Sequence, residues 1–296
     1  MTQVQVRGVW KEYGDQMVLE NINLDVADHA FVSLVGPSGC GKSTFLRMLL
    51  SQEQPTKGSI LIDGELIPSE PQPDRGVVFQ RYSVFPHLTA VENVALGREL
   101  EQAPWTGRLF GAARRAALEE AEAMLENVGL ISARDKYPSQ LSGGMQQRLA
   151  VAQALAKKPR ILLLDEPFGA LDPGIRSDIH DLMLDLWWET KMTVFMVSHD
   201  LREAFYLGTR VIAFDRDRED PQDQHRYGAR ITLDVGLDPA DPIKEKIRET
   251  EGQALMPELE EELGAQTTSI TSGRDDPATA QDTHRDGPID GKGSSQ

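Results

Sequence analysis

The chain has 296 residues, a formal charge of -16 at pH 7 and a single cysteine, Cys40. This length suits one large or two modest domains, and a hydrophobic content of 40% is enough for a buried core. The negative charge argues against a nucleic-acid partner bound by bulk electrostatics, and one cysteine excludes an intramolecular disulfide and fits a reducing compartment. No run approaches the roughly 18 apolar residues of a membrane span, and the N-terminal residues lack a signal core. We therefore expect a soluble protein that reaches a membrane only through a partner.

Two patterned stretches open the chain, at residues 4–10 and 18–26. Their apolar residues alternate with polar ones, which predicts two short antiparallel strands. Tyr13 lies between these strands. A loop aromatic at this position either stacks on an adenine ring or packs on the protein surface, and spacing alone favours neither.

An apolar run at residues 31–35, a glycine-rich segment and a helical pattern at residues 45–50 follow one another. The glycine-rich segment consists of Gly36, Pro37, Ser38, Gly39, Cys40, Gly41, Lys42, Ser43 and Thr44. It matches G-x-x-x-x-G-K-[ST], and its strand and helix flanks are the context that a phosphate-binding P-loop requires. Glycines let the backbone aim N–H groups at phosphate oxygens, and the helix adds its positive dipole end. Lys42 can then reach the β- and γ-phosphates of a nucleotide, and the Ser43 hydroxyl can ligate Mg²⁺.

The strand pattern continues beyond the P-loop and then gives way to a helical one. Residues 58–64 predict a strand that ends in an Asp-Gly turn, and residues 76–80 predict the next strand. Gln80, at the end of that strand, is a candidate contact to a γ-phosphate or to a metal-bound water, or an ordinary strand-terminal glutamine. From about residue 81 to 148 the apolar periodicity is helical, which predicts a helical subdomain inserted into an α/β core.

Inside the predicted helical subdomain, residues 103–111 form a loop with two aromatic side chains, Trp105 and Phe110. They either contact a partner or pack against the protein's own helices. We favour packing, because monomeric proteins rarely expose apolar patches.

A second glycine-rich segment, made of Ser142, Gly143 and Gly144, opens a helical run at residues 149–157. One interpretation is a second anion site, since N–H groups and the positive end of a helix dipole point outward from such a segment. The other is a plain helix cap.

Carboxylates follow a strongly apolar run at residues 161–164. Such a run is typical of a strand buried on both faces of a parallel sheet, and the carboxyl ends of these strands are where α/β sheets bind ligands. Asp165 is therefore placed to hold Mg²⁺ through water, and Glu166 to polarise an attacking water. His199 follows another apolar run, residues 193–197, and is either structural or functional.

The chain becomes polar after residue 215. Residues 211–214 complete the predicted sheet, with one more strand expected at residues 229–235. Residues 236–263 hold a possible C-terminal helix, and residues 264–296 have the composition of a disordered acidic tail. For this tail we favour a solubilising role over a regulatory one.

The ordered motifs resemble the nucleotide-binding subunits of ATP-binding cassette (ABC) transporters over residues 1 to about 215. The resemblance implies an α/β P-loop NTPase fold over residues 1–235, with a mixed β-sheet core, an N-terminal antiparallel β-subdomain and the inserted helical subdomain. For the nucleotide, it implies that Tyr13 stacks on adenine, Lys42 binds phosphate and Ser142 to Gly144 form the signature. For the metal and the reaction, it implies that Gln80 is the Q-loop sensor that also contacts the metal, Asp165 is the Walker B aspartate and Glu166 is the catalytic base. It also implies that Asp172 is the D-loop residue and that His199 is the switch histidine. Met145 stands where the family commonly has glutamine, a departure that we expect to be tolerated.

The same resemblance implies a head-to-tail dimer, formed by two copies of this chain or by one copy and a related ATPase subunit. Each ATP, with Mg²⁺, would be clamped between one subunit's P-loop and the other's signature. Residues 79–89 and 165–172 look like those of bacterial nitrate, sulfonate and taurine importers. Tyr82, Val84 and Phe85 would then contact a membrane permease at the inner face of the bacterial cell membrane. A periplasmic solute-binding protein would take part indirectly, and no nucleic acid would be bound.

Two alternatives use the same P-loop. A soluble ABC protein that acts on DNA or the ribosome usually carries long coiled-coil insertions or two cassettes, and this sequence has neither. A P-loop kinase for a small molecule has no use for the signature helix at residues 141–157. The expected activity is therefore ATP hydrolysis coupled to import of a small solute.

Overall fold

The computed structural model describes residues 3–79, 84–103, 105, 107–169, 171–218 and 226–237. All of these residues belong to one compact unit, Met1–Glu249. Gln80, Tyr82, residues 238–263 of the possible helix expected at 236–263 and the predicted tail at residues 264–296 lie outside the described residues.

An antiparallel sheet forms the N-terminal part of the unit. It contains β1 (Val4–Tyr13), β2 (Gln16–Val26), β4 (Lys57–Ile62) and β5 (Glu65–Leu66), in the order β2-β1-β4-β5. Val4 pairs with Val26 and Val6 with Leu24, so the alternating apolar residues share one buried face. The two predicted strands are confirmed, although they are longer than their patterns, at 10 and 11 residues.

The core sheet has the strand order β10-β9-β3-β8-β7-β6. Its strands are β3 (Phe31–Val35), β6 (Arg75–Val78), β7 (Ile161–Asp165), β8 (Thr193–Val197), β9 (Arg210–Asp215) and β10 (Arg230–Gly236). Five of the strands pair in parallel, and β10 is antiparallel to β9. All residues of β3 and β8 are buried, as expected for strands that are covered on both faces. The predicted mixed sheet is therefore confirmed.

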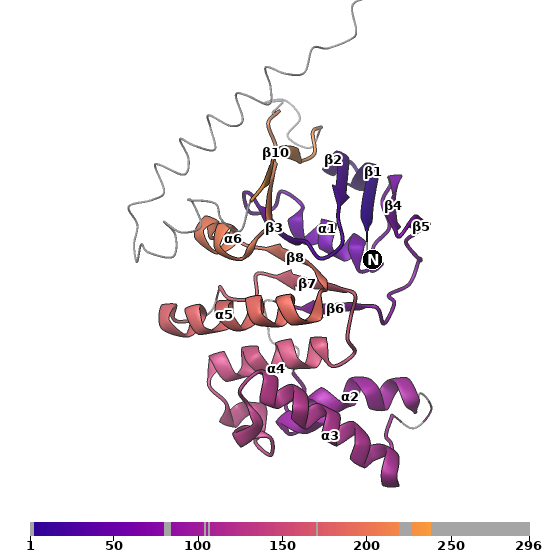
Figure 1. The fold of residues 1–296 in the computed structure, drawn as a ribbon. Coiled ribbons are helices and arrows are strands. Elements are labelled where there is room, and N and C mark those ends of the chain that lie inside the picture. Colours follow the sequence, from indigo (N-terminus) through magenta and orange to yellow (C-terminus); the bar gives the residue numbers. More distant parts are fainter. Residues whose placement is uncertain are drawn as a thin grey trace, which may run out of the picture. The chain divides into compact units, whose positions relative to one another are not determined.

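Helices cover both faces of the core sheet. They are α1 (Lys42–Leu49), α2 (Ala90–Gln102), α3 (Gly111–Asn127), α4 (Gly143–Leu155), α5 (Pro173–Thr190) and α6 (Leu201–Leu207). Leu162 and Leu164 of β7 pack in one hydrophobic cluster with α4 and α5, whereas Ile161 and Leu163 pack in another with α1 and β2. Because successive side chains of a strand point to opposite faces, α1 and α4 lie on opposite sides of the sheet (Figure 1).

The predicted helical subdomain consists of α2, α3 and α4, which Figure 1 shows grouped away from the N-terminal sheet. Two short 3-10 turns, Ile131–Ala133 and Pro138–Gln140, connect α3 to α4. The first described helix of this part begins at Ala90, and α4 continues beyond the expected limit of residue 148.

The aromatic loop between α2 and α3 differs from the favoured expectation. Trp105 is 98% exposed and Phe110 is 74% exposed, so neither side chain is covered by the neighbouring helices. Leu109, between them, is buried instead. The interpretation that the two aromatic residues pack on their own helices is therefore wrong, because local composition does not fix which side chains the tertiary structure covers.

Within the described part of the chain, no helix combines the length and the apolar character that crossing a bilayer requires.

Candidate functional site

Three loops meet at the carboxyl end of the core sheet because their strands are neighbours in the order β3-β8-β7. The backbone N–H of Ser198, after β8, donates to the carbonyl of Leu34 in β3 at 3.1 Å. The N–H of Glu166, after β7, donates to the carbonyl of Val197 in β8, also at 3.1 Å. These bonds fix the P-loop, the carboxylate pair and the histidine loop relative to one another.

The glycine-rich loop folds back on its own lysine. Lys42 is 4% exposed, and its Nζ donates to the carbonyl oxygens of Gly36 at 2.7 Å and Pro37 at 2.8 Å. The Sγ atom of Cys40, which is also buried, lies 3.6 Å from the same nitrogen. Because α1 begins at Lys42, its positive dipole end and free N–H groups face the loop. The loop therefore combines an ammonium group with a helix N-terminus, as a phosphate site requires.

Ser43 and Asp165 come together from α1 and β7. The Ser43 hydroxyl donates to Oδ1 of Asp165 at 2.9 Å. Hydroxyl and carboxylate oxygens are ligands that suit Mg²⁺, which usually completes its octahedron with water and substrate phosphates. Among the described residues no group of three or more His, Cys, Asp or Glu side chains could hold a metal alone. The pair therefore fits Mg²⁺ that is bound together with a nucleotide.

Glu166 and His199 are in direct contact, with Nε2 of the imidazole against Oε1 of the carboxylate. Glu166 has a backbone φ of 50°, in the left-handed region that residues other than glycine seldom adopt. A strained backbone conformation of this kind persists only where the surrounding contacts stabilise it, and such residues cluster at functional sites. Here the bond from the Glu166 N–H to Val197 holds this backbone and directs the carboxylate to His199.

Tyr13 lies at the end of β1 with 44% of its surface exposed. Its hydroxyl donates to the carboxylate of Glu53, and the Nζ atom of Lys11 lies 4.8 Å from the centre of its ring. Partial burial, together with the bond to Glu53, raises the pKa of the Tyr13 phenol, and a hydrogen bond with Thr44 opposes this shift. The phenol therefore stays neutral near pH 7 and is tied to the helix that carries the P-loop.

The second glycine-rich segment caps α4. The Ser142 hydroxyl accepts a bond from the Met145 N–H at 3.3 Å, and Ser142 and Gly143 are exposed. Gly144 is buried against Ile175, where an added Cβ would lie 2.4 Å from the Ile175 side chain. Ser142 therefore caps α4, and the second anion site stays a prediction. Because α4 is on the other face of the core sheet from α1, this segment is not part of the P-loop site of its own chain.

Asp172 caps α5 from an exposed position and makes no side-chain capping bond. Like the α4 cap, it belongs to the surface of the unit and takes no part in the Ser43–Asp165 and Glu166–His199 contacts described above.

One buried amide was missed by sequence analysis. Asn93 on α2 is fully buried, and its side chain bonds to both the N–H and the carbonyl of Phe85, at 2.7 and 3.1 Å, and to the carbonyl of Leu88 at 3.0 Å. It thereby holds the segment before α2. An asparagine within an apolar helical face was the only sequence signal, and asparagine is mostly exposed in proteins.

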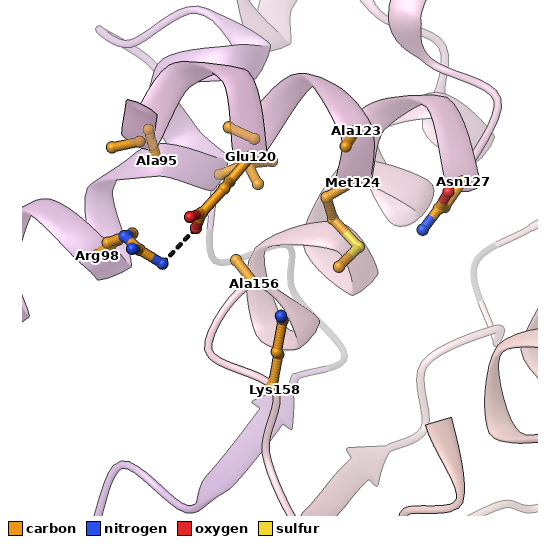
Figure 2. A pocket seen from close by; sticks show the side chains of 11 residues that line it. Ala95, Arg98, Glu120, Ala123, Met124, Asn127, Ala156 and Lys158 are labelled. Atoms are coloured by element: carbon orange, nitrogen blue, oxygen red, sulfur yellow. Dashed lines mark hydrogen bonds and ion pairs between the residues drawn. The ribbon is translucent and has the colours of Figure 1, made fainter. Parts of the chain in front are cut away.

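A hollow of about 260 Å³ lies elsewhere, among α2, α3 and the segment after α4. Its wall is rich in alanine and includes Met124, and an Arg98–Glu120 ion pair lies at one side (Figure 2). It has no glycine-rich loop, so it lacks the N–H groups that bind a nucleotide phosphate in a P-loop.

A P-loop with its lysine, joined through Ser43 to an aspartate at the end of a parallel strand, defines a P-loop nucleoside triphosphatase. The sequence profile of the ABC transporter family matches residues 19–169. The chain belongs to the ABC transporter family.

Three curated relatives show the same similarity. A bicarbonate transport ATP-binding protein of Synechocystis is 44% identical over 199 residues, which are 67% of this chain and 68% of the relative. A nitrate import ATP-binding protein of the same organism is 41% identical over 198 residues, or 67% and 71% of the two chains. An aliphatic sulfonates import ATP-binding protein of Bacillus anthracis is 40% identical over 203 residues, or 69% and 76%.

A solved structure agrees with the fold. It is the dimeric ATP-binding cassette MJ0796 in a post-hydrolysis state with ADP and phosphate, which is 32% identical to this chain. The match covers 79% of this chain and 99% of the cassette, with a TM-score of 0.62. The predicted family, fold and ATP hydrolase activity are confirmed, whereas the roles of single residues stay predictions.

Proposed function

We propose that this chain uses ATP hydrolysis to drive import of a small oxyanion through a separate membrane permease. The observation that best supports this chemistry is that two contacts, Ser43 with Asp165 and Glu166 with His199, lie beside the P-loop. The relatives named for bicarbonate, nitrate and sulfonates support the class of solute, since each of these solutes is an oxyanion. A nitrate-like or sulfonate-like solute, taurine included, fits this class.

In the proposed reaction the N–H groups of residues 38–44 and the Lys42 ammonium bind the phosphates of ATP. Glu166 accepts a hydrogen bond from a water and orients it for in-line attack on the γ-phosphorus, while His199 holds the carboxylate. The new P–O bond forms as the bond to the β–γ bridging oxygen breaks, which releases ADP and phosphate. Ser43, Asp165 and the predicted Gln80 would hold Mg²⁺, directly or through water, and the ion would neutralise charge on the phosphates.

The proposed working unit is a dimer. The caps at Ser142 and Asp172 are exposed and lie outside the P-loop contacts of their own chain, so each is free to meet a second subunit. In a head-to-tail dimer the N–H groups of the segment Ser142 to Gly144 would face the γ-phosphate bound by the partner subunit. ATP would then close the dimer and hydrolysis would reopen it. The second subunit is either another copy of this chain or a related ATPase subunit.

The proposed permease contact lies at the segment before α2. A hollow of about 200 Å³ is lined there by Phe85 and His87, with Arg108 and Arg114 among its charged residues. Phe85 is 40% exposed, whereas Val84 packs against the hydrophobic core, so we assign the contact to Phe85 and to the predicted Tyr82. The chain would thus be held at the inner face of the bacterial membrane, and a periplasmic binding protein would act only through the permease.

Affinity purification of the tagged chain from detergent-solubilised native membranes, followed by mass spectrometry, tests this proposal. We expect a multi-span permease in stoichiometric amount, and its loss with Phe85→Glu. Leu66→Glu is the matched control, because Leu66 is 68% exposed on β5 of the N-terminal sheet. Recovery of ribosomal or DNA-repair proteins without a permease would favour the soluble ABC class instead.

A further inference from the structure

Three buried polar side chains next to the Glu166–His199 contact form a hydrogen-bonded series. His180 on α5 and Glu203 on α6 are 8% and 7% exposed, and their Nε2 and Oε1 atoms are 2.9 Å apart. The other oxygen of Glu203 accepts a bond from the hydroxyl of Ser198, which is 2% exposed. A buried carboxylate requires such partners, because an unpaired charge in an apolar interior is costly.

This hydrogen-bonded series ends at the loop that carries His199. The Ser198 hydroxyl accepts a bond from the Asp200 N–H at 3.0 Å, so it spans the residue between them. While the Ser198 hydroxyl donates its proton to Glu203, its oxygen can accept the hydrogen bond from the Asp200 N–H. Without Glu203 as acceptor, the hydroxyl would turn to the Asp200 carbonyl, which is 3.2 Å away. The orientation of His199 between these two residues thus depends on Glu203.

The other end of this hydrogen-bonded series lies on α5, which begins directly after Asp172. Arg176, one helical turn before His180, donates to the Leu171 carbonyl at 3.2 Å and lies 3.5 Å from a carboxylate oxygen of Asp200. Residues four apart share a helix face, so the Arg176 contact with Asp200 and the His180 contact with Glu203 lie on the same side of α5. The Phe168 ring packs edge-on against His180, with ring centres 4.9 Å apart. A displacement of α5 therefore reaches the His199 loop through two polar links.

We propose that His180 and Glu203 are positioning residues for ATP hydrolysis, which link the start of α5 to the orientation of His199. The proposal rests on the proposed roles of Glu166 and His199. His180 touches neither nucleotide nor water in this scheme and acts only through Glu203 and Ser198.

Steady-state ATPase kinetics of the full chain test the proposal with His180→Leu, which fills the site but cannot bond to Glu203. We expect kcat to fall about tenfold, as for the loss of an outer hydrogen-bond partner, with KM for ATP within about twofold of wild type. His180→Gln can still donate to Glu203 and is expected to recover kcat to within about threefold. Tyr206→Phe is the matched control, since it removes a hydrogen bond to Asp181 between the same two helices and leaves Glu203 untouched. Its kcat is expected to stay within about twofold of wild type.

A double variant separates positioning from general stability. In the His199→Ala background His180→Leu should lower kcat no further, because the residue through which it acts is gone. Losses that multiply in the double variant, or a wild-type kcat for His180→Leu, would overturn the proposal. A wild-type kcat for His199→Ala would instead refute the proposed role of His199 itself. If His180→Leu does not fold, Ser198→Ala, which deletes only the hydroxyl link, carries the same expectations.

Discussion

Gly36→Ala tests how tightly the P-loop is held against the core sheet. Gly36 has a φ of 138°, and an added Cβ would lie 2.0 Å from the backbone carbonyl oxygen of Phe214 in β9. Real contacts of this kind do not fall below 3.0 Å, so loop and strand must separate by 3.0 − 2.0 = 1.0 Å. Backbone strain of about 1–3 kcal/mol adds to an overpacking cost of about 1–3 kcal/mol. We expect the free energy of unfolding to fall by about 4 kcal/mol.

Gly39→Ala in the same loop is the control. Gly39 has a φ of 80°, and its added Cβ would meet no atom within 4 Å, so only the backbone term of about 1–2 kcal/mol applies. Urea unfolding followed by far-ultraviolet circular dichroism measures both variants by linear extrapolation. If Gly36→Ala loses no more than about 1 kcal/mol beyond Gly39→Ala, the argument from the Phe214 contact is refuted.

Three further predictions concern Ser43, Glu53 and the C-terminal residues. Ser43→Ala should weaken Mg²⁺-dependent ATP binding about tenfold and leave ATP binding in EDTA unchanged. A fluorescent ATP analogue measures both affinities, and equal losses in the two conditions would contradict the metal role of Ser43. Burial raises the pKa of Glu53, but hydrogen bonds from Tyr13 and Lys11, together with the charges of Lys11 and Arg47, lower it below its ordinary value of 4.5. The stability that its charge contributes is therefore present above pH 4.5 and is lost as the pH falls through the lower folded-state pKa. The melting-temperature advantage of wild type over Glu53→Gln should therefore shrink between pH 7 and pH 3, and a constant difference would speak against it. Deletion of residues 264–296 should leave basal ATPase activity within a few-fold, whereas strong activation would identify the tail as inhibitory.

The parts of the fold that the sequence predicted well are those with a local physical signal. The apolar runs at β3, β7 and β8 are typical of buried strands, and the glycine-rich loop after β3 matched a motif whose backbone geometry is known. Topology then brings Asp165, Glu166 and His199 to one edge, because the carboxyl ends of parallel strands share it. The common location of these three residues beside the P-loop was therefore predictable, whereas their roles stay predictions.

The contacts inside the site were not predictable in the same way. The left-handed backbone of Glu166 and its contact with His199 depend on the pairing of β7 with β8, which no local pattern specifies. The His180–Glu203 link joins residues 23 positions apart on two helices, and either side chain alone suits an exposed helical face. Trp105 shows the converse error, since an apolar side chain that composition assigns to the interior is 98% exposed.

The measurement that tests the central claim most directly is ATP turnover and dimer formation by Glu166→Gln. The substitution keeps the size of the side chain and removes the carboxylate that orients the attacking water. We predict that steady phosphate release is abolished while analytical ultracentrifugation detects a dimer that forms only with ATP, because binding no longer leads to reopening. A variant that hydrolyses ATP at the wild-type rate would contradict the account and remove Glu166 from the reaction.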